Sequence, residues 1–312
     1  MPPEKTQRDA FWDRVYEIAL ANRDVVVVSA DMGAPSLDKF RAHLSGQYVD
    51  VGIAEQQAIA VAAGLALEGK KVFAYAIAPF ITLRCYEQIR LELAAMNIPV
   101  TLVGVGAGMS YDDSGPTHHT VEDISVLRIL PNMRINSVSD SVMAAAFAEL
   151  SCRFEFPNYV RLDRKRLPTI YREDQDFTPG LATLVMGDSY ILATGNMVHR
   201  ALDVSDELRK HGMKAGVVDI YTLPVNKGLF LNTVKEAKAL FTLEEHTLPG
   251  GFGSAICEVL SDNHRPIPLK RFGLNLTTGY CYRYGGRERL QALYGLGKED
   301  IINSILEEWG RL

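Results

Sequence analysis

Several features that would define a protein class at once are scarce or missing in this chain of 312 residues. Its four cysteines lie far apart and form no Cys-x-x-Cys pair, so we expect reduced thiols and no disulfide framework. No apolar run approaches the ~18 residues that a membrane-spanning helix needs. The net charge of −5 offers no basic character for binding nucleic acid. Since the first residues are polar and unlike a signal peptide, we expect a cytoplasmic protein that binds neither membranes nor nucleic acid.

Motifs for binding phosphate and metal are also missing. There is no GxxxxGK[ST] loop, and no GxGxxG segment opens a helix after a strand. A Gly-Asp-Gly motif, whose oxygen ligands would suit Mg²⁺ or Ca²⁺, is absent as well: the pair Gly187-Asp188 is followed by Ser189. We therefore predict no metal ligand in this chain.

What the chain does contain is an alternation of strand and helix patterns. The run VVVVSA at 25–30 is β-branched and apolar, which is typical of a strand buried on both faces of a parallel sheet. The alternation predicts an α/β fold. In the first part of the chain we expect strands at 25–30, 71–78, 99–106, 134–138 and 158–163, and helices at 8–21, 54–68, 82–96, 121–130 and 140–153.

The alternation stops in a proline-containing acidic stretch and then resumes. This stretch contains prolines and acidic residues and shows neither a helical nor a strand periodicity, which indicates a linker. We predict a parallel-sheet domain over residues 1–167, a linker over 168–184, and a smaller α/β domain over 185–312. The smaller domain should hold strands at 189–194, 214–220, 237–245 and 266–274, and helices at 198–211, 226–237, 252–262 and 298–310.

One carboxyl stands at the start of the most apolar helix pattern. Glu55, in GIAEQQ (52–57), is followed by AIAVAAGLALEG. Apolar surroundings disfavour the charged form of a carboxyl, so Glu55 is expected to stay protonated and to donate a hydrogen bond. The alternative is that Glu55 only places a negative charge at the positive end of the helix dipole.

Two other segments have residue types suited to a site. Phe80 follows a predicted strand and a proline, where its ring can project from the sheet edge and stack on a flat ligand. In the loop 106–119, Pro116 precedes His118 and His119, and histidine suits hydrogen bonding and proton transfer to hydroxyls. Core packing of Phe80 and an exposed turn with incidental histidines are the alternatives.

Charged residues and glycines at element ends are further candidates. Arg161 and Arg164 end a predicted strand, at the edge of the sheet where α/β proteins commonly bind anions, although an ion pair with Asp163 is equally compatible. The segment GGFGS (250–254) could bind an anion at a helix N-terminus, but we favour close packing there, because the preceding EEH is no phosphate cradle.

The motifs occur together in the order found in the C-terminal half of transketolases. The chain resembles the C-terminal subunit of a split-gene, two-chain transketolase, and the match includes SADMGAPS (29–36), VGIAEQQ (51–57), RCYEQIR (84–90), SGPTHHTVEDI (114–124), LRILPN (127–132), LATGN (192–196) and TLEEHTLPGGFGSA (242–255). The resemblance implies a pyrimidine-binding domain followed by a smaller transketolase C-terminal domain. It also implies thiamine diphosphate and Mg²⁺ as cofactors. The partner would be an N-terminal subunit that binds the metal and the diphosphate, in a heterotetramer.

The same resemblance assigns roles to residues around the cofactor. Glu55 would bond a nitrogen of the aminopyrimidine ring and favour its imino form. Phe80 would pack on that ring, while Ile77 and Leu83 stand where the family has further aromatic residues. His118 would contact the hydroxyls of the sugar and the reacting centre.

The resemblance is less uniform for the residues that would bind the anionic end of the sugar. Arg8 and Arg164 match arginines that hold a phosphate, Ser36 lies near a serine with the same task, and Arg161 is a further candidate. Gly106 stands where the family has a phosphate-binding histidine, and Ser114 replaces an aspartate. These departures leave open whether the sugar carries a phosphate or another anion, such as a sulfonate.

The resemblance predicts transfer of a two-carbon ketol unit from a ketose to an aldose. Two alternatives remain: a deoxyxylulose-phosphate synthase-like half or a 2-oxoacid dehydrogenase β-subunit, and a non-catalytic scaffold subunit. The GPTHH and EEH segments favour the sugar branch over the dehydrogenase, and the presence of Glu55 and His118 argues against a scaffold.

Overall fold

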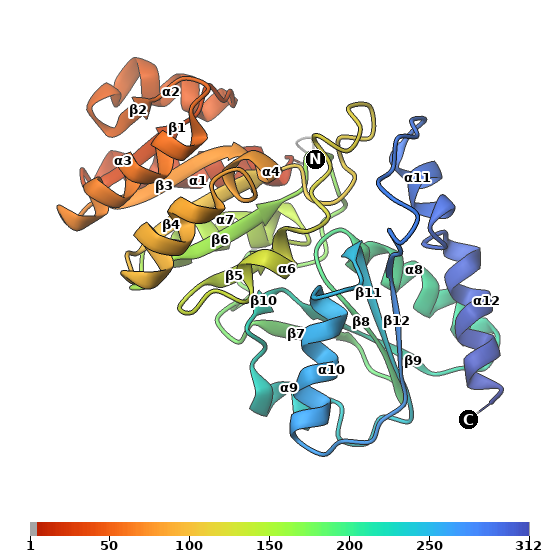
Figure 1. Cartoon of the computed structure of the whole chain (residues 1–312). Helices are drawn as coiled ribbons and strands as arrows, with labels where there is room; N and C mark the ends of the chain where they lie inside the picture. The colour runs from red at the N-terminus through yellow and green to blue at the C-terminus, as the bar shows by residue number, and fades with distance from the viewer. Residues whose placement is uncertain (1–4, 312) are drawn as a thin grey trace. The chain divides into compact units, whose positions relative to one another are not determined.

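The computed structural model describes residues 5–311, which form two compact units (Figure 1). Unit 1 comprises the chain up to Ala107 together with Val126–Thr178, and unit 2 comprises Gly108–Ser125 together with the chain from Pro179 onward. The two units follow the predicted order of a larger and a smaller α/β part, but the segment 108–125 groups with unit 2 and was expected in the first domain. The boundaries predicted for the domains themselves stay predictions.

Unit 1 is built on a parallel sheet with the strand order β5-β6-β4-β3-β1-β2. Each neighbouring pair is parallel, as the β-branched runs predicted. The short edge strand β2 was not predicted, because three residues are too few for a periodic pattern. The strands are β1 (Val25–Ser29), β2 (Tyr48–Asp50), β3 (Lys71–Ile77), β4 (Val100–Val105), β5 (Arg134–Ser137) and β6 (Asn158–Leu162).

Helices connect these strands. The predicted helix over 82–96 is confirmed for residues 86–95 and wrong at its start: a short turn of helix at 78–81 and a break at 82–85 come before it. The N–H groups of Leu83 and Arg84 both donate to the carbonyl of Pro79, at 3.0 and 3.2 Å, so the first turn closes on itself and ends. The helices are α1 (Gln7–Ala21), α2 (Pro35–His43), η1 (Ser45–Gln47), α3 (Glu55–Leu67), α4 (Ala78–Ile81), α5 (Tyr86–Gln88), η2 (Ile89–Ala95) and α7 (Ser141–Ser151).

Aromatic rings form the centre of unit 1. Phe11 and Trp12 on α1 are fully buried, and their rings lie 5.9 and 6.4 Å from the ring of Phe73 on β3. Trp12 also packs on Tyr75, with ring centroids 4.8 Å apart. Burial of such rings dominates the stability of a small core, so α1 is fixed firmly against the sheet.

Unit 2 has a five-stranded sheet in the order β12-β11-β8-β9-β7, parallel except for β7, which pairs antiparallel with β9. The last residues of the predicted linker, 181–184, lie in β7. The strands are β7 (Leu181–Val185), β8 (Ser189–Ala193), β9 (Ala215–Ile220), β11 (Leu240–Thr247) and β12 (Leu269–Leu274), with a two-residue β10 (Thr222–Leu223). The helices are α6 (Asp123–Leu127), at the border of the units, α8 (Met197–Lys210), α9 (Lys227–Thr233), α10 (Phe252–Asp262), α11 (Arg287–Leu293) and α12 (Lys298–Trp309).

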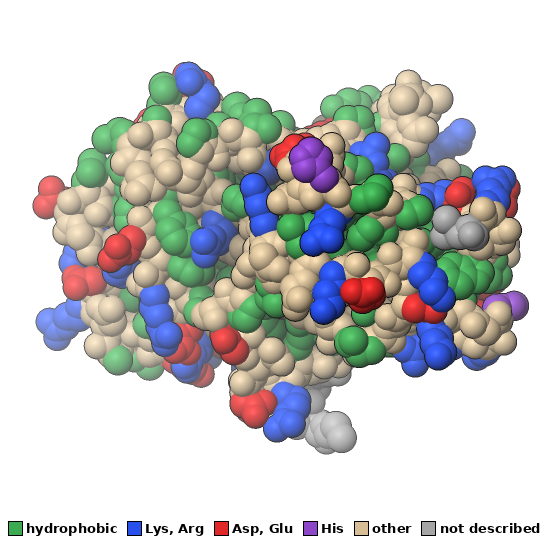
Figure 2. Space-filling view, turned by 90° about the horizontal axis from the view of Figure 1, so that it is seen from below, with side chains coloured by type: hydrophobic (Ala, Val, Ile, Leu, Met, Phe, Trp, Pro, Cys, Tyr) green, Lys and Arg blue, Asp and Glu red, His purple; other side chains and the backbone are tan. Residues whose placement is uncertain are grey.

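The surface agrees with the composition. On the face shown in Figure 2, acidic and basic side chains are interspersed and apolar side chains are scattered between them. Among the described residues, no helix is both long enough and apolar enough to cross a membrane.

One close approach in unit 1 has a direct test. Gly104 on β4 leaves no room for a side chain, because a Cβ there would lie 2.8 Å from the Tyr159 ring and 3.0 Å from Cα of Ala78. We expect Gly104→Ala to lower the free energy of unfolding by about 1–3 kcal/mol, as overpacking does, in a urea titration.

Gly64→Ala is the matched control for this substitution. Gly64 lies within α3, and a Cβ there would meet nothing within 4 Å. Alanine favours a helix over glycine by about 0.5–1 kcal/mol, so this variant should be more stable than the wild type. Equal destabilisation by both substitutions would refute the packing argument.

Candidate active site

Glu55 begins helix α3 just after a tight turn. Gly52 takes the left-handed conformation, with φ of 69°, and its N–H donates to Oδ1 of Asp50 at 2.9 Å. The chain therefore reverses directly after β2 and delivers Glu55 as the first residue of the helix. Its side chain is almost fully buried, with a residue exposure of 4%. A carboxyl in this place is shielded from water and near the positive end of a helix dipole.

The partner of this carboxyl is an arginine that the sequence analysis did not single out. Nη1 of Arg84 donates to Oε2 of Glu55 at 2.7 Å, and the guanidinium lies over the Phe80 ring, 4.2 Å from its centroid. The sequence analysis expected purely apolar surroundings for Glu55, and the contact with Arg84 shows that this expectation is wrong. Since a guanidinium only donates hydrogen bonds, Glu55 acts as an acceptor here, whereas the sequence analysis expected a donor.

Phe80 is presented by the short turn of helix α4. The thiol of Cys85 donates to the carbonyl of Phe80 at 3.1 Å, and α4 packs on both β3 and β4. Ile77 and Leu83, at the two ends of this turn, are each half-buried. Phe80 thus lies in α4, Ile77 just before it and Leu83 just after it, and α4 packs against helix α3, which Glu55 begins.

Cys85 is electrostatically linked to this pair but stays a thiol. Burial, together with the charge of Glu55, raises the pKa of Cys85 to about 12, although the charge of Arg84 opposes the shift. A thiol with so high a pKa is a poor nucleophile at neutral pH, so Cys85 acts here as a packing residue.

The histidine loop belongs to unit 2. His118 is half-buried, with Nδ1 3.0 Å from Oγ1 of Thr117 and its ring 5.6 Å from that of Tyr111. His119 is 4% exposed, and among the described residues its Nε2 has no hydrogen-bond partner. Burial lowers the pKa of His119, although the charge of Glu245 opposes this, so the ring is neutral at pH 7. His118 is thus the histidine of the pair that reaches solvent.

A buried ion pair holds the start of this loop, and sequence reasoning missed it. Glu245 on β11 accepts from Nε of Arg287 at 2.9 Å, from Nε2 of Gln291 at 2.6 Å and from the N–H of Met109 at 3.1 Å. A Cβ at position 108 would overlap the Glu245 carboxylate, so this position requires glycine. No local pattern could have revealed contacts that join residues more than forty positions apart.

The end of the loop is fixed by the neighbouring histidine. The N–H of Ile124 donates to Nε2 of His246 at 3.1 Å, and the N–H of Thr247 donates to the carbonyl of Val121 at 2.8 Å. Glu244 accepts from the N–H groups of Phe252 and Gly253, at 2.7 and 2.8 Å. The glycine-rich entry to α10 therefore packs against its own strand, as the sequence analysis favoured over anion binding.

The residues predicted to hold an anion lie in different surroundings. Arg8 on α1 pairs with Asp9, Nε to Oδ1 at 2.9 Å, and its side chain is one-third exposed. Ser36 is buried and donates to Asp13. Arg161 lies near the end of β6 and is buried, whereas Arg164 just beyond the strand is exposed. Their roles stay predictions.

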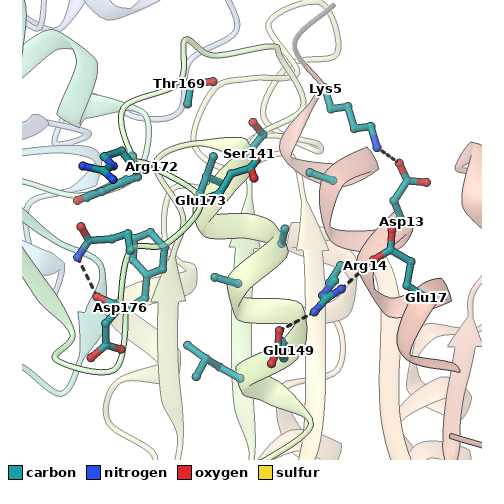
Figure 3. Close-up of a pocket in the computed structure, with 18 of the residues that line it drawn as sticks. Lys5, Asp13, Arg14, Glu17, Ser141, Glu149, Thr169, Arg172, Glu173 and Asp176 are labelled. Carbon is teal, nitrogen blue, oxygen red and sulfur yellow. Dashed lines mark hydrogen bonds and ion pairs between the residues drawn. The ribbon is translucent and has the colours of Figure 1, made fainter. Parts of the chain in front are cut away.

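A groove in unit 1 lies apart from Glu55. It has a cavity volume of about 1090 Å³ and is lined by α1, α7 and residues 169–177, with no residue of α3 or α4 (Figure 3). Charges at its rim pair with one another: Lys5 with Asp13 at 2.6 Å, and Arg14 with Glu17 and Glu149. Because none of the residues predicted for the site lines it, the groove is not part of the candidate site.

Comparison with known proteins defines the class. The chain belongs to the transketolase family, because the model of the transketolase pyrimidine-binding domain matches residues 4–169 and that of the transketolase C-terminal domain matches residues 187–301. The predicted family and fold are thereby confirmed.

Individual relatives extend over nearly the whole chain. One of the subunits of the apulose-4-phosphate transketolase of Phocaeicola vulgatus is 36% identical over 96% of this chain and 96% of its own length. The 6-deoxy-6-sulfo-D-fructose transketolase subunit SqwH of a Clostridium species is 34% identical over 96% of this chain and 93% of its own. A solved structure described as a split-gene transketolase, an inactive beta4 tetramer, has a TM-score of 0.87, is 31% identical and covers 97% of both chains.

The contribution of the buried ion pair between Glu245 and Arg287 to stability can be tested by substitution and by its dependence on pH. Burial raises the pKa of Glu245, but the charge of Arg287 and the hydrogen bonds to the carboxylate lower it more, so the pKa lies below its ordinary value. A lowered pKa in the folded state gives stability that is present above the unfolded pKa of about 4.3 and is lost as the pH falls below it. We expect Glu245→Gln to cost about 3–5 kcal/mol at pH 7, because Arg287 stays buried without a counter-charge.

The measurement is urea unfolding of both proteins between pH 7 and pH 3. The difference between wild type and variant should be constant at the upper end and shrink below about pH 4. Glu236→Gln, an exposed site in unit 2, is the control and should change little. A difference that does not depend on pH would contradict the assignment of a charged, paired Glu245.

Proposed function

We propose that this chain is the C-terminal subunit of a two-chain, thiamine diphosphate-dependent transketolase that moves a two-carbon ketol unit from an anionic ketose to an aldose. The observation that carries the proposal is that a buried carboxyl, Glu55, and an aromatic ring, Phe80, both contact one guanidinium, that of Arg84, and so lie on either side of the same space. That pair offers one hydrogen-bonding group and one stacking surface, which is what a flat nitrogen heterocycle requires. The identity of the cofactor, thiamine diphosphate, is inferred from membership of the transketolase family.

The residues of unit 1 fit the pyrimidine end of the cofactor. Glu55 would hold a hydrogen bond to a ring nitrogen and keep the proton shared at that atom. Phe80 would stack on the ring, and Ile77 and Leu83 would exclude water from its edges. When bound, thiamine diphosphate supplies the nucleophilic carbon for cleaving a bond next to a carbonyl, while the protein contributes orientation and charge.

Residues outside the ring site would act on the sugar. His118 would hydrogen-bond to the sugar's hydroxyls, since its ring reaches solvent and its neighbour His119 does not. Arg8, Ser36, Arg161 and Arg164 would hold the anionic tail. One relative is named for a sugar phosphate and another for a sulfo-sugar, which supports leaving the tail's chemistry open between these two anions.

The diphosphate end of the cofactor requires a second chain in this proposal. Among residues 5–311, no group of three His, Cys, Asp or Glu side chains is arranged to hold a metal ion. The partner would be an N-terminal subunit that binds Mg²⁺ and diphosphate, in a heterotetramer. Support comes from relatives named as subunits and from the solved relative described as an inactive beta4 tetramer.

Dependence on the partner is directly testable. The purified subunit, given thiamine diphosphate, Mg²⁺, a ketose phosphate donor and an aldose acceptor, should show no ketol transfer. Adding the N-terminal subunit should restore turnover, and removing Mg²⁺ with EDTA should abolish it again. Robust turnover by this subunit alone would refute the two-chain proposal.

Supplying pyruvate as donor to the same reconstituted pair separates the alternatives. A pair that consumes pyruvate and not ketoses is a deoxyxylulose-phosphate synthase-like or 2-oxoacid-dehydrogenase enzyme. A pair that consumes neither donor is a scaffold.

Glu55 is tested by truncation in the reconstituted pair. We expect Glu55→Ala to lower kcat by about 10²–10⁴-fold, the range for losing an acid–base group. Glu68→Ala, an exposed glutamate at the opposite end of the same helix, is the matched control and should retain activity. If Glu55→Ala keeps full turnover, the proposed role in cofactor activation is wrong.

A further inference from the structure

The position of Arg84 has a consequence for cofactor binding. We propose that Arg84 occupies the ring site of the free subunit, bonded to Glu55 and stacked on Phe80, and must swing away before the cofactor's ring can bind. This inference rests on the proposed function, which assigns Glu55 and Phe80 to that ring.

Arg84 makes both contacts that the proposed ring would make. Its guanidinium is flat, donates to Oε2 of Glu55 at 2.7 Å and lies 4.2 Å from the centroid of the Phe80 ring. A planar, hydrogen-bonding nitrogen heterocycle would use the same carboxyl and the same aromatic face. Guanidinium and ring therefore compete for one acceptor and one stacking surface.

The backbone of Arg84 is fixed, so only its side chain would need to move. Its N–H donates to the carbonyl of Pro79 at 3.2 Å, and its own carbonyl accepts from Nε2 of Gln56 at 3.3 Å. Its side chain, in contrast, is 45% exposed. Rotation about side-chain bonds can thus carry the guanidinium into water without disturbing α3 or α4.

The chemistry of the two partners shows why the guanidinium cannot replace the ring in the proposed reaction. A guanidinium stays protonated in proteins and offers hydrogen-bond donors alone, so it cannot exchange a proton with Glu55. With Arg84 in place, Oε2 of Glu55 accepts from a charged donor and the guanidinium covers the Phe80 ring. A ring that stacks on Phe80 and bonds that oxygen needs the space that the guanidinium fills. In the free subunit, the Glu55 carboxyl therefore stays bonded to Arg84 until the cofactor binds.

The test is the affinity of the reconstituted pair for thiamine diphosphate, measured by isothermal titration calorimetry. Arg84→Ala should lower the Kd about tenfold, because the ring no longer has to displace an ion pair and a cation–π contact. Arg84→Lys should fall between wild type and Arg84→Ala, since lysine keeps the charge and loses the flat donor group. Arg153→Ala, an exposed arginine paired with Glu149, is the control and should leave the Kd unchanged.

A second measurement does not depend on the cofactor. In the subunit alone, Arg84→Ala should lower the urea midpoint of unfolding, because Glu55 loses its hydrogen-bond partner. Arg84→Ala would thus bind the cofactor more tightly while being less stable without it. A residue that only supported the fold would weaken both properties together.

The outcomes separate this inference from the proposed function. If the wild-type pair binds thiamine diphosphate and Arg84→Ala binds it equally or more weakly, Arg84 does not compete with the ring and the inference is overturned. If the wild-type pair binds no thiamine diphosphate, the proposed function is wrong and the inference fails with it.

Discussion

The parallel order of the strands in unit 1 is the constraint on which the candidate site depends. In a parallel sheet all carboxyl ends lie along one edge, and the segments that follow them meet there. Glu55 comes shortly after β2, Phe80 directly after β3, and Arg161 stands near the end of β6. The parallel order of the strands thus places residues more than a hundred positions apart in sequence at the same edge of the sheet. The glycine at position 104 adds the local condition, because it lets α4 lie close to β4.

A large part of this arrangement could be predicted from the sequence. Uninterrupted β-branched runs identify strands buried on both faces, and their alternation with helical patterns implies the parallel sheet. Glu55 was recognisable because a single carboxyl at the head of an apolar helix is conspicuous. Phe80 and His118 were recognisable by their motifs, which several ordered segments of the chain support together.

The remainder could not be predicted, for physical reasons that differ from residue to residue. Helix 82–96 has a continuous helical pattern, and its break arises from two N–H groups that share the Pro79 carbonyl. Arg84 looks like an ordinary surface charge, because its relation to Glu55 depends on the fold between them. Glu245, Arg287 and Met109 are far apart in sequence, and only tertiary structure shows that one carboxylate joins them.

The anchoring of the histidine loop also restricts where this chain could be divided. In sequence, residues 108–125 come before the last strands of the first sheet. Their hydrogen-bond partners Glu245, His246 and Arg287, however, belong to the part of the chain that forms unit 2. A gene broken between the codons for Thr178 and Pro179 would encode a first fragment whose histidine loop has lost its anchors. Fission at that boundary would therefore separate the loop from the side chains that shape it.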